Sequence, residues 1–172
     1  MGVASYGYLA DMLGKKTWLK SNTQKAKEMA AEWVKMADDG DHYRLTFDKP
    51  GTWSQKYNLV WDKLLNLQIF PKNVAETEIA YYLSKQNKYG LPLDNRETYT
   101  KTDWIMWTAT LANDKATFEK FIEPVYLFMN VTPNRVPMSD WVFTDEPNQR
   151  GFQARSVVGG YYIKMLEGKL IK

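Results

Sequence analysis

The sequence contains no cysteine, a single histidine and no block of basic residues. Without cysteine there is no disulfide, no thiolate zinc ligand and no thiol nucleophile, and one histidine cannot by itself form a metal cluster. The 23 basic and 20 acidic residues are spread along the chain, so a net charge of +3 creates no surface typical of phosphate-backbone binding. We therefore expect no nucleic-acid partner, no metal site and no cofactor, and we interpret His42 as an ordinary loop residue.

Long apolar runs are also missing. No stretch approaches the ~18 residues that a membrane-spanning helix needs, and Ser5, Tyr6 and Asp11 interrupt the first apolar stretch, so the chain does not open with a signal-peptide pattern. We expect no membrane partner. Hydrophobic residues nevertheless make up 44% of the 172 residues and aromatic residues 15%. A chain of this size and composition can bury one core, which predicts a single domain over residues 1–172.

Apolar residues at three- and four-residue spacing, bounded by capping residues, predict seven helices joined by alternating short and long connections. The first is expected at residues 3–13, the second before residue 39, the third from residue 52 or 54 to about 68, the fourth from residue 71, the fifth from residue 100 or 102 to 111, the sixth after a cap at residues 113–114, and the seventh at residues 153–166. The first long connection contains an alternating stretch, residues 42–47, that we interpret as a short strand or hairpin.

The helices repeat. The odd-numbered helices are expected to begin near residues 5, 53, 103 and 154, at intervals of 48, 50 and 51 residues. This spacing is typical of repeated helical hairpins, of which the chain would hold about three and a half. If neighbouring helices are antiparallel, the long loops meet at the N-terminal ends of the odd helices, where loops carry function and helix dipoles favour carboxylates.

Three segments carry a family resemblance: GTWSQKYNLVWDKLL at residues 51–65, YTKTDW at 99–104 and GFQARSVVGG at 151–160. They closely resemble the C-terminal region of the glutaminase A family, which comprises large secreted proteins of fungi and bacteria, and the likeness covers nearly the whole chain. The resemblance implies an all-α fold in which antiparallel helical hairpins form about half of an (α/α)6 six-hairpin toroid. It also implies a C-terminal fragment of a larger protein, located outside the cell or in the periplasm.

The family name implies hydrolysis of the side-chain amide of L-glutamine to L-glutamate and ammonia. We therefore expect the chain to form the C-terminal toroid portion of a glutaminase-like amidohydrolase that binds a small molecule. The isolated fragment should be inactive and should self-associate or pack against the missing N-terminal half. Two alternatives remain open: part of a carbohydrate-active, glycoside hydrolase-like enzyme, because carboxylates and stacking aromatics suit saccharides, or a non-catalytic binding module.

Carboxylates are the natural agents of hydrolysis in this chain, because one acid with a raised pKa and one ionised acid can together activate water and protonate a leaving group. We select Asp103, which opens a helix next to Trp104, and Asp140, which precedes Trp141, as catalytic candidates. The plainer alternatives are charge complementarity with the helix N-terminus for Asp103 and an Asx-turn for Asp140.

The substrate-binding candidates are polar or aromatic residues near the same loop-rich end. Lysine and arginine suit a substrate carboxylate, whereas glutamine and asparagine suit an amide or a hydroxyl. Capping and core packing explain the residues of the third helix equally well, and a salt bridge to a loop aspartate explains the arginine. We interpret the Gly159-Gly160 pair as a close helix contact, and we expect Asp103, Arg155 and the third helix to share one cleft. The candidates are Trp53, Gln55, Lys56, Asn58, Trp104, Trp141, Gln153 and Arg155.

Overall fold

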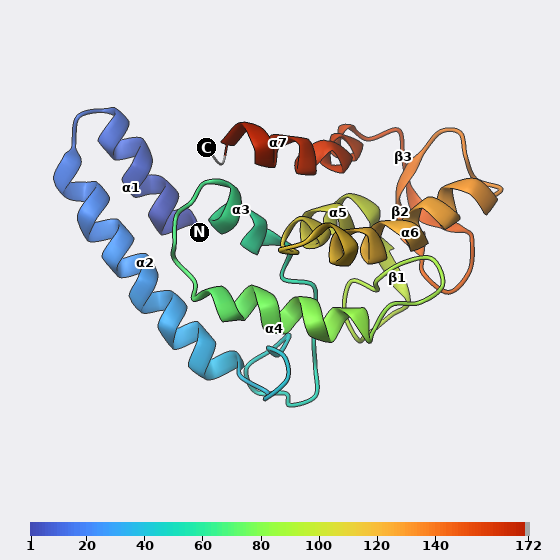
Figure 1. Ribbon diagram of the computed structural model, residues 1–172, viewed down its shortest axis with the longest axis horizontal. Coiled ribbons are helices and arrows are strands. Elements are labelled where there is room, and N and C mark those ends of the chain that lie inside the picture. Colours follow the sequence, from blue (N-terminus) through green and yellow to red (C-terminus); the bar gives the residue numbers. More distant parts are fainter. Residues whose placement is uncertain (171–172) are drawn as a thin grey trace.

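The computed structural model describes residues 1–170 (Figure 1). Within that range the chain is mostly helical, with about 55% of its residues in helices, so the prediction of a mainly helical protein is confirmed. The strands are β1 (Tyr99–Lys101), β2 (Ser139–Phe143) and β3 (Gln149–Gln153), and the short 3-10 helices are η1 (Tyr57–Leu59) and η2 (Ser156–Tyr162). The α-helices are α1 (Gly2–Met12), α2 (Lys16–Ala37), α3 (Val60–Leu64), α4 (Lys72–Leu83), α5 (Thr102–Thr110), α6 (Lys115–Val131) and α7 (Ile163–Leu170).

Helices α1 and α2 form an antiparallel hairpin at one end of the molecule (Figure 1). Gly14, at a φ of +78°, supplies the left-handed turn residue between them. The two helices pack so closely that a Cβ on Gly7 would lie 3.0 Å from the Cβ of Asn22. A small apolar cluster attaches this hairpin to the segment before α4, and it consists of Ala4, Ala26, Ala30, Leu67 and Ile69.

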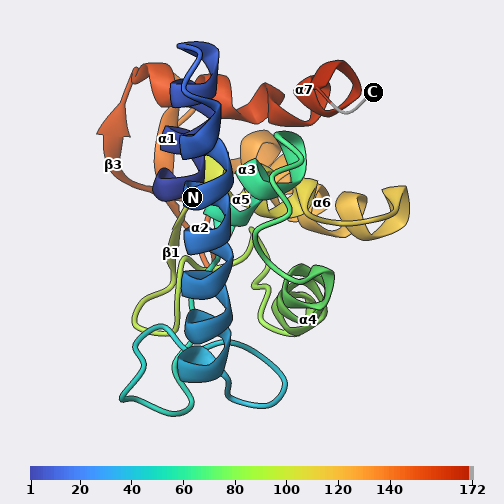
Figure 2. The same cartoon turned by 90° about the vertical axis from the view of Figure 1, so that its left-hand side faces the viewer.

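Helix α5 lies at the centre of the fold. It contacts η1, α3, α6, α7 and η2 as well as strands β1 and β2, and Figure 2 shows it between the sheet on one side and α6 and α4 on the other. Ile105 and Ala109 of this helix are fully buried, and they belong to the main core with Leu64, Tyr82 and Phe121. The first turn of α5 therefore carries its side chains into a rigid environment.

The expectation of an all-α fold is wrong in one respect, because the chain contains a three-stranded antiparallel sheet in the order β1-β2-β3. Lys101 pairs with Trp141, and Trp141 pairs with Gly151. Two of the strands lie within the proline-containing connection after α6, where the sequence predicted only a loop. β2 pairs with β1, some forty residues earlier in the chain, and β3 pairs with β2. The long-range contribution from β1 leaves no local periodicity in the sequence.

The third helix is much shorter than expected: η1 begins at Tyr57 and α3 ends at Leu64. Asn66 and Gln68 adopt positive φ angles of 49° and 54°, which a continuing helix cannot contain. The carboxylate of Asp62 accepts hydrogen bonds from the backbone N–H groups of Ile69 and Phe70, both at 2.9 Å. This side chain closes the turn and so ends the helix early.

The seventh helix also differs from the expected residues 153–166. Strand β3 occupies the first of them, and the 3-10 helix η2 precedes α7, which begins only at Ile163. Phe152 and Ala154 have φ angles of 53° and 52° and break any helix at that point. By contrast, the sixth helix starts as expected, because the Asp114 side chain accepts the backbone N–H of Thr117 at 2.8 Å as an N-cap.

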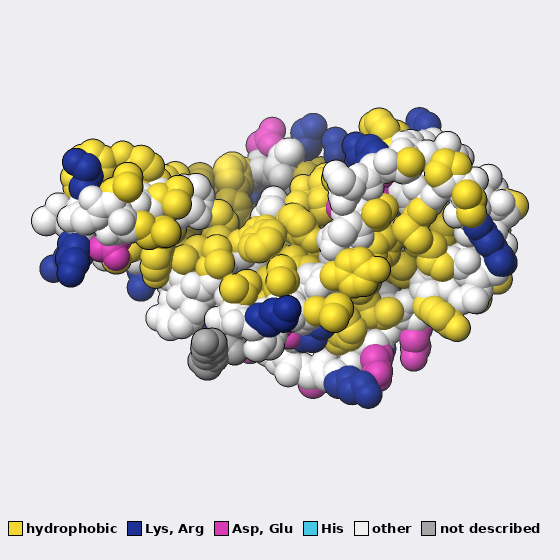
Figure 3. Space-filling view, turned by 90° about the horizontal axis from the view of Figure 1, so that it is seen from above, with side chains coloured by type: hydrophobic (Ala, Val, Ile, Leu, Met, Phe, Trp, Pro, Cys, Tyr) yellow, Lys and Arg dark blue, Asp and Glu magenta, His cyan; other side chains and the backbone are white. Residues whose placement is uncertain are grey.

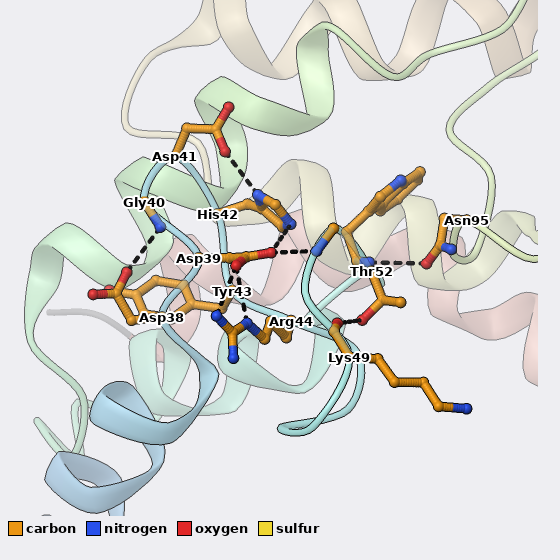
Figure 4. Close-up of polar contacts among 12 residues, drawn as sticks. Asp38, Asp39, Gly40, Asp41, His42, Tyr43, Arg44, Lys49, Thr52 and Asn95 are labelled. Carbon is orange, nitrogen blue, oxygen red and sulfur yellow. Dashed lines mark hydrogen bonds and ion pairs between the residues drawn. The ribbon is translucent and has the colours of Figure 1, made fainter.

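Residues 42–47, expected as a short strand or hairpin, form no regular strand: apart from one antiparallel bridge between Asp38 and Tyr43, this segment is part of a loop closed by Asp39 (Figure 4). The Asp39 carboxylate accepts hydrogen bonds from the backbone N–H of Gly51 at 2.6 Å and from Nε of Arg44 at 2.9 Å. The hydrogen bond from Gly51 has the larger effect and the one from Arg44 the next, and together they hold the pKa of Asp39 below its ordinary value. The Asp39 side chain therefore adds to the backbone hydrogen bonds of this loop, which include Arg44 N–H to Ala37 O at 2.7 Å and Leu45 N–H to Thr52 O at 3.1 Å.

One surface is distinctly apolar. Seen from above, hydrophobic side chains form a broad area bordered by lysine and arginine (Figure 3). The large exposed side chains near the two ends of the chain include Met12 at 82% exposure, Met165 at 69% and Tyr162 at 67%. Among residues 1–170, no helix has the length and hydrophobicity needed to cross a membrane.

Candidate functional site

The junction of β1 and α5 brings the candidate site together. The chain leaves the sheet at Lys101 in an extended conformation and enters the helix at Thr102, so Lys101 and Asp103 project near the edge of the sheet. Because Lys101 is in register with Trp141, the preceding residue, Asp140, lies beside the same junction. Sequence positions almost forty residues apart thus meet at one point.

Asp140 is the anionic centre of this region. It is 1% exposed, and its carboxylate accepts hydrogen bonds from Lys101 Nζ at 2.9 Å and from Arg155 Nε and Nη2 at 3.1 and 2.6 Å. Burial by itself opposes ionisation, but the hydrogen bonds from Arg155 and Lys101 outweigh it and hold the pKa of Asp140 below its ordinary value. Asp140 is therefore a firmly ionised carboxylate, bound on two sides by cations.

Two aromatic rings flank these charges. Trp141 and Phe152 stack with their centroids 4.9 Å apart. Lys101 Nζ lies 4.9 Å from the Trp141 ring and 4.3 Å from the Phe152 ring, and the Arg155 guanidinium carbon lies 4.2 Å from Phe152. Cation–π contacts of this kind attract both basic groups to the rings and hold them in place. Lys101 and Arg155 share the single carboxylate of Asp140, so these three residues together carry a net positive charge.

Asp103 contrasts with Asp140. It is 4% exposed, and its Oδ1 atom is buried without a hydrogen-bond partner. Burial is the main reason that the pKa of Asp103 rises to about 6, and the neighbouring charge of Asp140 raises it further. The two aspartates therefore have pKa values displaced in opposite directions, which is the usual condition for dividing acid and base roles between carboxyl groups.

The 3-10 helix η2 covers Asp103. The hydroxyl of Tyr161 hydrogen-bonds with the hydroxyl of Thr102, while Arg155 at the N-cap of η2 is held by Asp140. Gly160 lies directly against α5, because a Cβ built on it would be 2.9 Å from Trp107 Nε1 and 3.0 Å from the Cβ of Asp103. The close helix contact expected of the glycine pair therefore exists at Gly160, whereas nothing lies within 4 Å of a Cβ on Gly159.

An open cavity of about 380 Å³ lies beside this region. Tyr57 and Trp104 form part of its wall as a stacked pair with centroids 4.2 Å apart, and Asn58 also lines it. Burial first, and then the charge of Asp103, raises the pKa of the Tyr57 hydroxyl. Tyr57 thus links the cavity electrostatically to Asp103, although neither Asp103 nor Arg155 lines this cavity.

Gln55 lines the same cavity, but the protein itself occupies its polar groups. Its amide nitrogen donates to the backbone carbonyls of Leu91 and Pro92 at 3.1 and 3.0 Å and to the Thr100 hydroxyl at 3.1 Å. Its oxygen accepts from the hydroxyl of Thr108 at 2.9 Å. In this conformation Gln55 ties β1 and α5 to the loop before them.

Lys56 belongs to a second buried network. Its ammonium donates to the carbonyls of Tyr43 and Ser54 at 2.8 and 2.9 Å and lies 3.6 Å from a Glu78 oxygen. Glu78 is fully buried and accepts the Tyr43 backbone N–H at 2.6 Å and the Tyr82 hydroxyl. Burial raises the pKa of Glu78 and lowers that of Lys56, and each charge partly offsets the effect on the other.

The other selected residues are placed as follows. Trp53 is 6% exposed and belongs to the main core, where it contacts the rings of Tyr81 and Tyr82. Gln153 is exposed at the end of β3 and donates to the Gln149 side chain at 2.9 Å. His42 is buried, stacks on Tyr81 at 4.2 Å and lies 2.7 Å from a carboxylate oxygen of Asp41. Among the described residues, no group of three or more histidines or carboxylates could hold a metal ion.

Asp103, Asp140, Trp141 and Arg155 therefore come together around the start of α5, whereas Asn58 and Trp104 line the adjoining cavity. Sequence reasoning missed further members of the site, although Lys101 lies within the YTKTDW segment that carried the family resemblance. Tyr57 and Phe152 likewise lie within the segments 51–65 and 151–160, and Trp107 follows Asp103 by one turn of α5, whereas Tyr161 is brought in by η2. The missed residues are Tyr57, Lys101, Trp107, Phe152 and Tyr161.

These features define a helical-hairpin protein with a buried pair of dissimilar carboxylates. The chain belongs to the family described as the glutaminase A six helical-hairpin domain, whose model matches residues 1–165. It is 28% identical to "Glutaminase A" of Aspergillus oryzae over 173 aligned positions, which cover 96% of this chain and 25% of that protein. It is 29% identical to "Probable glutaminase/05536" of Arthroderma benhamiae, over 72% of this chain and 18% of that protein.

The chain thus spans about a quarter or less of the length of these curated relatives. No solved structure matches it.

Proposed function

We propose that this chain forms the C-terminal part of an (α/α)6 toroid in a secreted or periplasmic glutaminase-like amidohydrolase that converts L-glutamine to L-glutamate and ammonia. Membership of the glutaminase A six-hairpin family and the names of the two relatives support the reaction and the toroid. Consecutive helices pack against each other in two places, α1 against α2 and α5 against α6, and this supports the hairpin organisation.

The observation that carries the proposal is the contrast between the two aspartates at the start of α5. Asp140 is held ionised by Lys101 and Arg155, whereas Asp103 is buried with a pKa of about 6 and one oxygen without a partner. A carboxyl group of that pKa can accept and return a proton at neutral pH. We assign the role of general base and acid to Asp103 and that of an electrostatic support to Asp140.

The reaction then proceeds through addition of water. The Asp103 carboxylate takes a proton from a water molecule whose oxygen forms a bond to the carboxamide carbon. The same group returns that proton to the amide nitrogen, the carbon–nitrogen bond breaks, and ammonia leaves. The new carboxylic acid loses its own proton to solvent, so atoms and charge balance. No atom changes its oxidation state in this reaction.

A second candidate function has a specific observation in its favour. The stacked Tyr57–Trp104 pair on the wall of the 380 Å³ cavity resembles an aromatic platform for a sugar ring, and the charge of Asp103 acts on Tyr57 although Asp103 does not line the cavity. A glycoside hydrolase-like activity would use the same residues, with Asp103 protonating the glycosidic oxygen. A panel of glycosides assayed beside glutamine separates the two reactions.

The decisive experiment is an Asp103→Asn substitution in the intact protein, followed by ammonia release from L-glutamine. We expect kcat to fall about 10²–10⁴-fold, because the amide keeps the shape but cannot transfer the proton. Asp48→Asn is the matched control, since Asp48 is exposed. An Asp103→Asn protein with unchanged turnover would remove Asp103 from the chemistry, and wild-type protein that cleaves a glycoside but not glutamine would favour the second function.

We further propose that the isolated 172-residue chain has no glutaminase activity and self-associates, or packs against other hairpins of the intact protein. Support comes from the exposed apolar side chains of α1 and α7, such as Met12 and Met165, because large apolar surfaces usually mark interfaces. Light scattering at increasing concentration should show dimers or larger species. A strictly monomeric profile, or robust turnover of glutamine by this chain alone, contradicts the proposal.

A further inference from the structure

Two buried polar atoms without partners belong to side chains that pack against the same glycine. Asp103 Oδ1 and Trp107 Nε1 are both buried and make no hydrogen bond. A Cβ on Gly160 would lie 2.9 Å from Trp107 Nε1, 3.0 Å from the Asp103 Cβ and 3.7 Å from its Oδ2 atom. Buried polar groups are nearly always paired, so two neighbouring exceptions, one of which can only donate, call for a common explanation.

The Trp107 ring is held rigidly. It packs edge-on against Trp61, with centroids 5.2 Å apart, and against Tyr57 at 6.1 Å. A cavity of about 540 Å³ adjoins this ring, lined by Trp61, Trp107, Gly160 and residues of α7. The indole N–H is therefore fixed in direction before any ligand arrives, and a route from the surface leads to the glycine that covers it.

We propose that Trp107 Nε1 and Asp103 Oδ1 form a binding pair for a primary carboxamide, with Trp107 donating to the carbonyl oxygen and Asp103 accepting from the amino group. This inference rests on the proposed function and deepens it, because it assigns a second residue to the reacting amide. A primary carboxamide presents one acceptor and one donor, and these two protein atoms, one helical turn apart on α5, offer the complementary donor and acceptor. A sugar hydroxyl has no requirement for that arrangement.

The cover over the pair must move for the ligand to enter. None of the residues of η2 is buried, and its two ends are held by the Arg155–Asp140 ion pair and the Tyr161–Thr102 hydrogen bond. A shift of Gly160 away from α5 therefore has to release the packing of Tyr161 against the main core as well as its hydrogen bond to Thr102. As negative charge develops on the carbonyl oxygen during attack by water, the fixed indole N–H stabilises it more strongly than in the ground state.

The first test is binding in the intact protein with indole nitrogens labelled for NMR. Propionamide serves as the minimal carboxamide, and propionate and methyl glucoside serve as competing ligand classes. The Trp107 indole signal, assigned from its absence in Trp107→Phe, should shift with propionamide, and that substitution should weaken binding about tenfold. Trp18→Phe, on the α1–α2 hairpin, is the control. An indole signal unmoved by propionamide, or moved only by the glucoside, overturns the proposal.

The second test is kinetic and separates this inference from the proposed function. We expect Trp107→Phe to reduce kcat on L-glutamine about 10²-fold with a small change in KM, because one donor to the developing oxyanion is lost. Wild-type protein that binds propionamide through Trp107 but does not hydrolyse glutamine would refute the proposed function and retain the binding pair. Glutamine hydrolysis with unchanged kcat in Trp107→Phe and an unmoved indole signal would refute the binding pair alone.

Discussion

Glu78 and Asp103 are both buried acids whose pKa values are raised chiefly by burial, but their surroundings differ. Both carboxylate oxygens of Glu78 accept hydrogen bonds, from the Tyr43 N–H and the Tyr82 hydroxyl, and Lys56 supplies a counter-charge at 3.6 Å. Asp103 retains an oxygen without a partner. Burial alone therefore does not separate these two acids, whereas the number of satisfied oxygens does.

The difference also appears in what covers each acid. The Glu78 network lies between α4 and the loop that Asp39 closes, and its hydrogen bonds join these elements. Asp103 is covered by η2, which has no buried residue of its own. A protein tolerates an unsatisfied buried group where function requires it and where a small movement exposes it. The two acids should consequently respond in opposite ways to substitution.

The largest expected effect on stability is at Glu78. Glu78→Ala leaves the Lys56 ammonium buried without its counter-charge and should reduce the free energy of unfolding by about 3–5 kcal/mol. Asp103→Asn should instead raise it at pH 7, by up to about 3 kcal/mol, because the neutral amide avoids the cost of ionising this buried acid. Urea denaturation midpoints measured at pH 7 give both values. If Asp103→Asn is the more destabilising change, the distinction between the two acids is wrong.

The pH dependence of stability should show the Asp103 contribution separately. The pKa of Asp103 rises from 3.8 to about 6 in the folded protein, so the folded state binds this proton more tightly than the unfolded state. The resulting stabilisation is fully present below pH 3.8 and is lost as the pH rises through about 6. At about 1.4 kcal/mol per pH unit, the loss amounts to about 3 kcal/mol.

The measurement compares unfolding free energies at pH 4 and pH 7 in the wild type and in Asp103→Asn. The wild type should lose about 3 kcal/mol more than the variant over this interval. The charged and titratable groups near Asp103 are Lys101, Asp140, Arg155, Tyr57 and Tyr161, of which only Asp140 titrates at acidic pH, and its pKa is lowered. Equal pH dependence in the two proteins would show that Asp103 ionises normally.

The sequence predicted the helices where local signals determine them. The Asp114 cap and the apolar face of α6 are encoded within a few residues, and so is the turn at Gly14. The sheet was missed because strands of three to five residues acquire their stability from partners far along the chain. Helix η1–α3 was placed too long because Asp62 binds backbone groups seven and eight residues ahead, an interaction that apolar periodicity does not reveal.

The candidate site could be predicted only in part for the same reason. Asp103 and Asp140 were selected from their positions beside tryptophans, but the ion pairs that separate their properties come from Lys101, 39 residues before Asp140, and from Arg155, 15 residues after it. Gln55 and Lys56 were selected because they were expected to lie at the same loop-rich end of the domain. Nothing in the local sequence indicates that carbonyls of residues 91 and 92, or Glu78, would occupy their polar groups.

The smallest expected effect separates two adjacent glycines that differ only in what lies next to them. A methyl group on Gly160 would meet Trp107 Nε1 at 2.9 Å and the Asp103 Cβ at 3.0 Å, and the Trp107 ring is held in place by Trp61. Gly160→Ala should therefore cost about 1–3 kcal/mol of stability and push η2 away from α5. Gly159→Ala meets no atom within 4 Å and should be neutral or stabilise by up to about 1 kcal/mol.

Displacement of the cover makes a second, independent prediction for the same pair of variants. Because burial is the main cause of the raised pKa of Asp103, admitting water in Gly160→Ala should bring that pKa down from about 6 toward its ordinary value, whereas Gly159→Ala should leave it unchanged. Carboxyl carbon signals followed through a pH titration in both variants measure the difference. A high pKa in Gly160→Ala together with lost stability would mean that the α5 side of the contact yields instead of η2, and Asp103 would then be as closed a structural acid as Glu78.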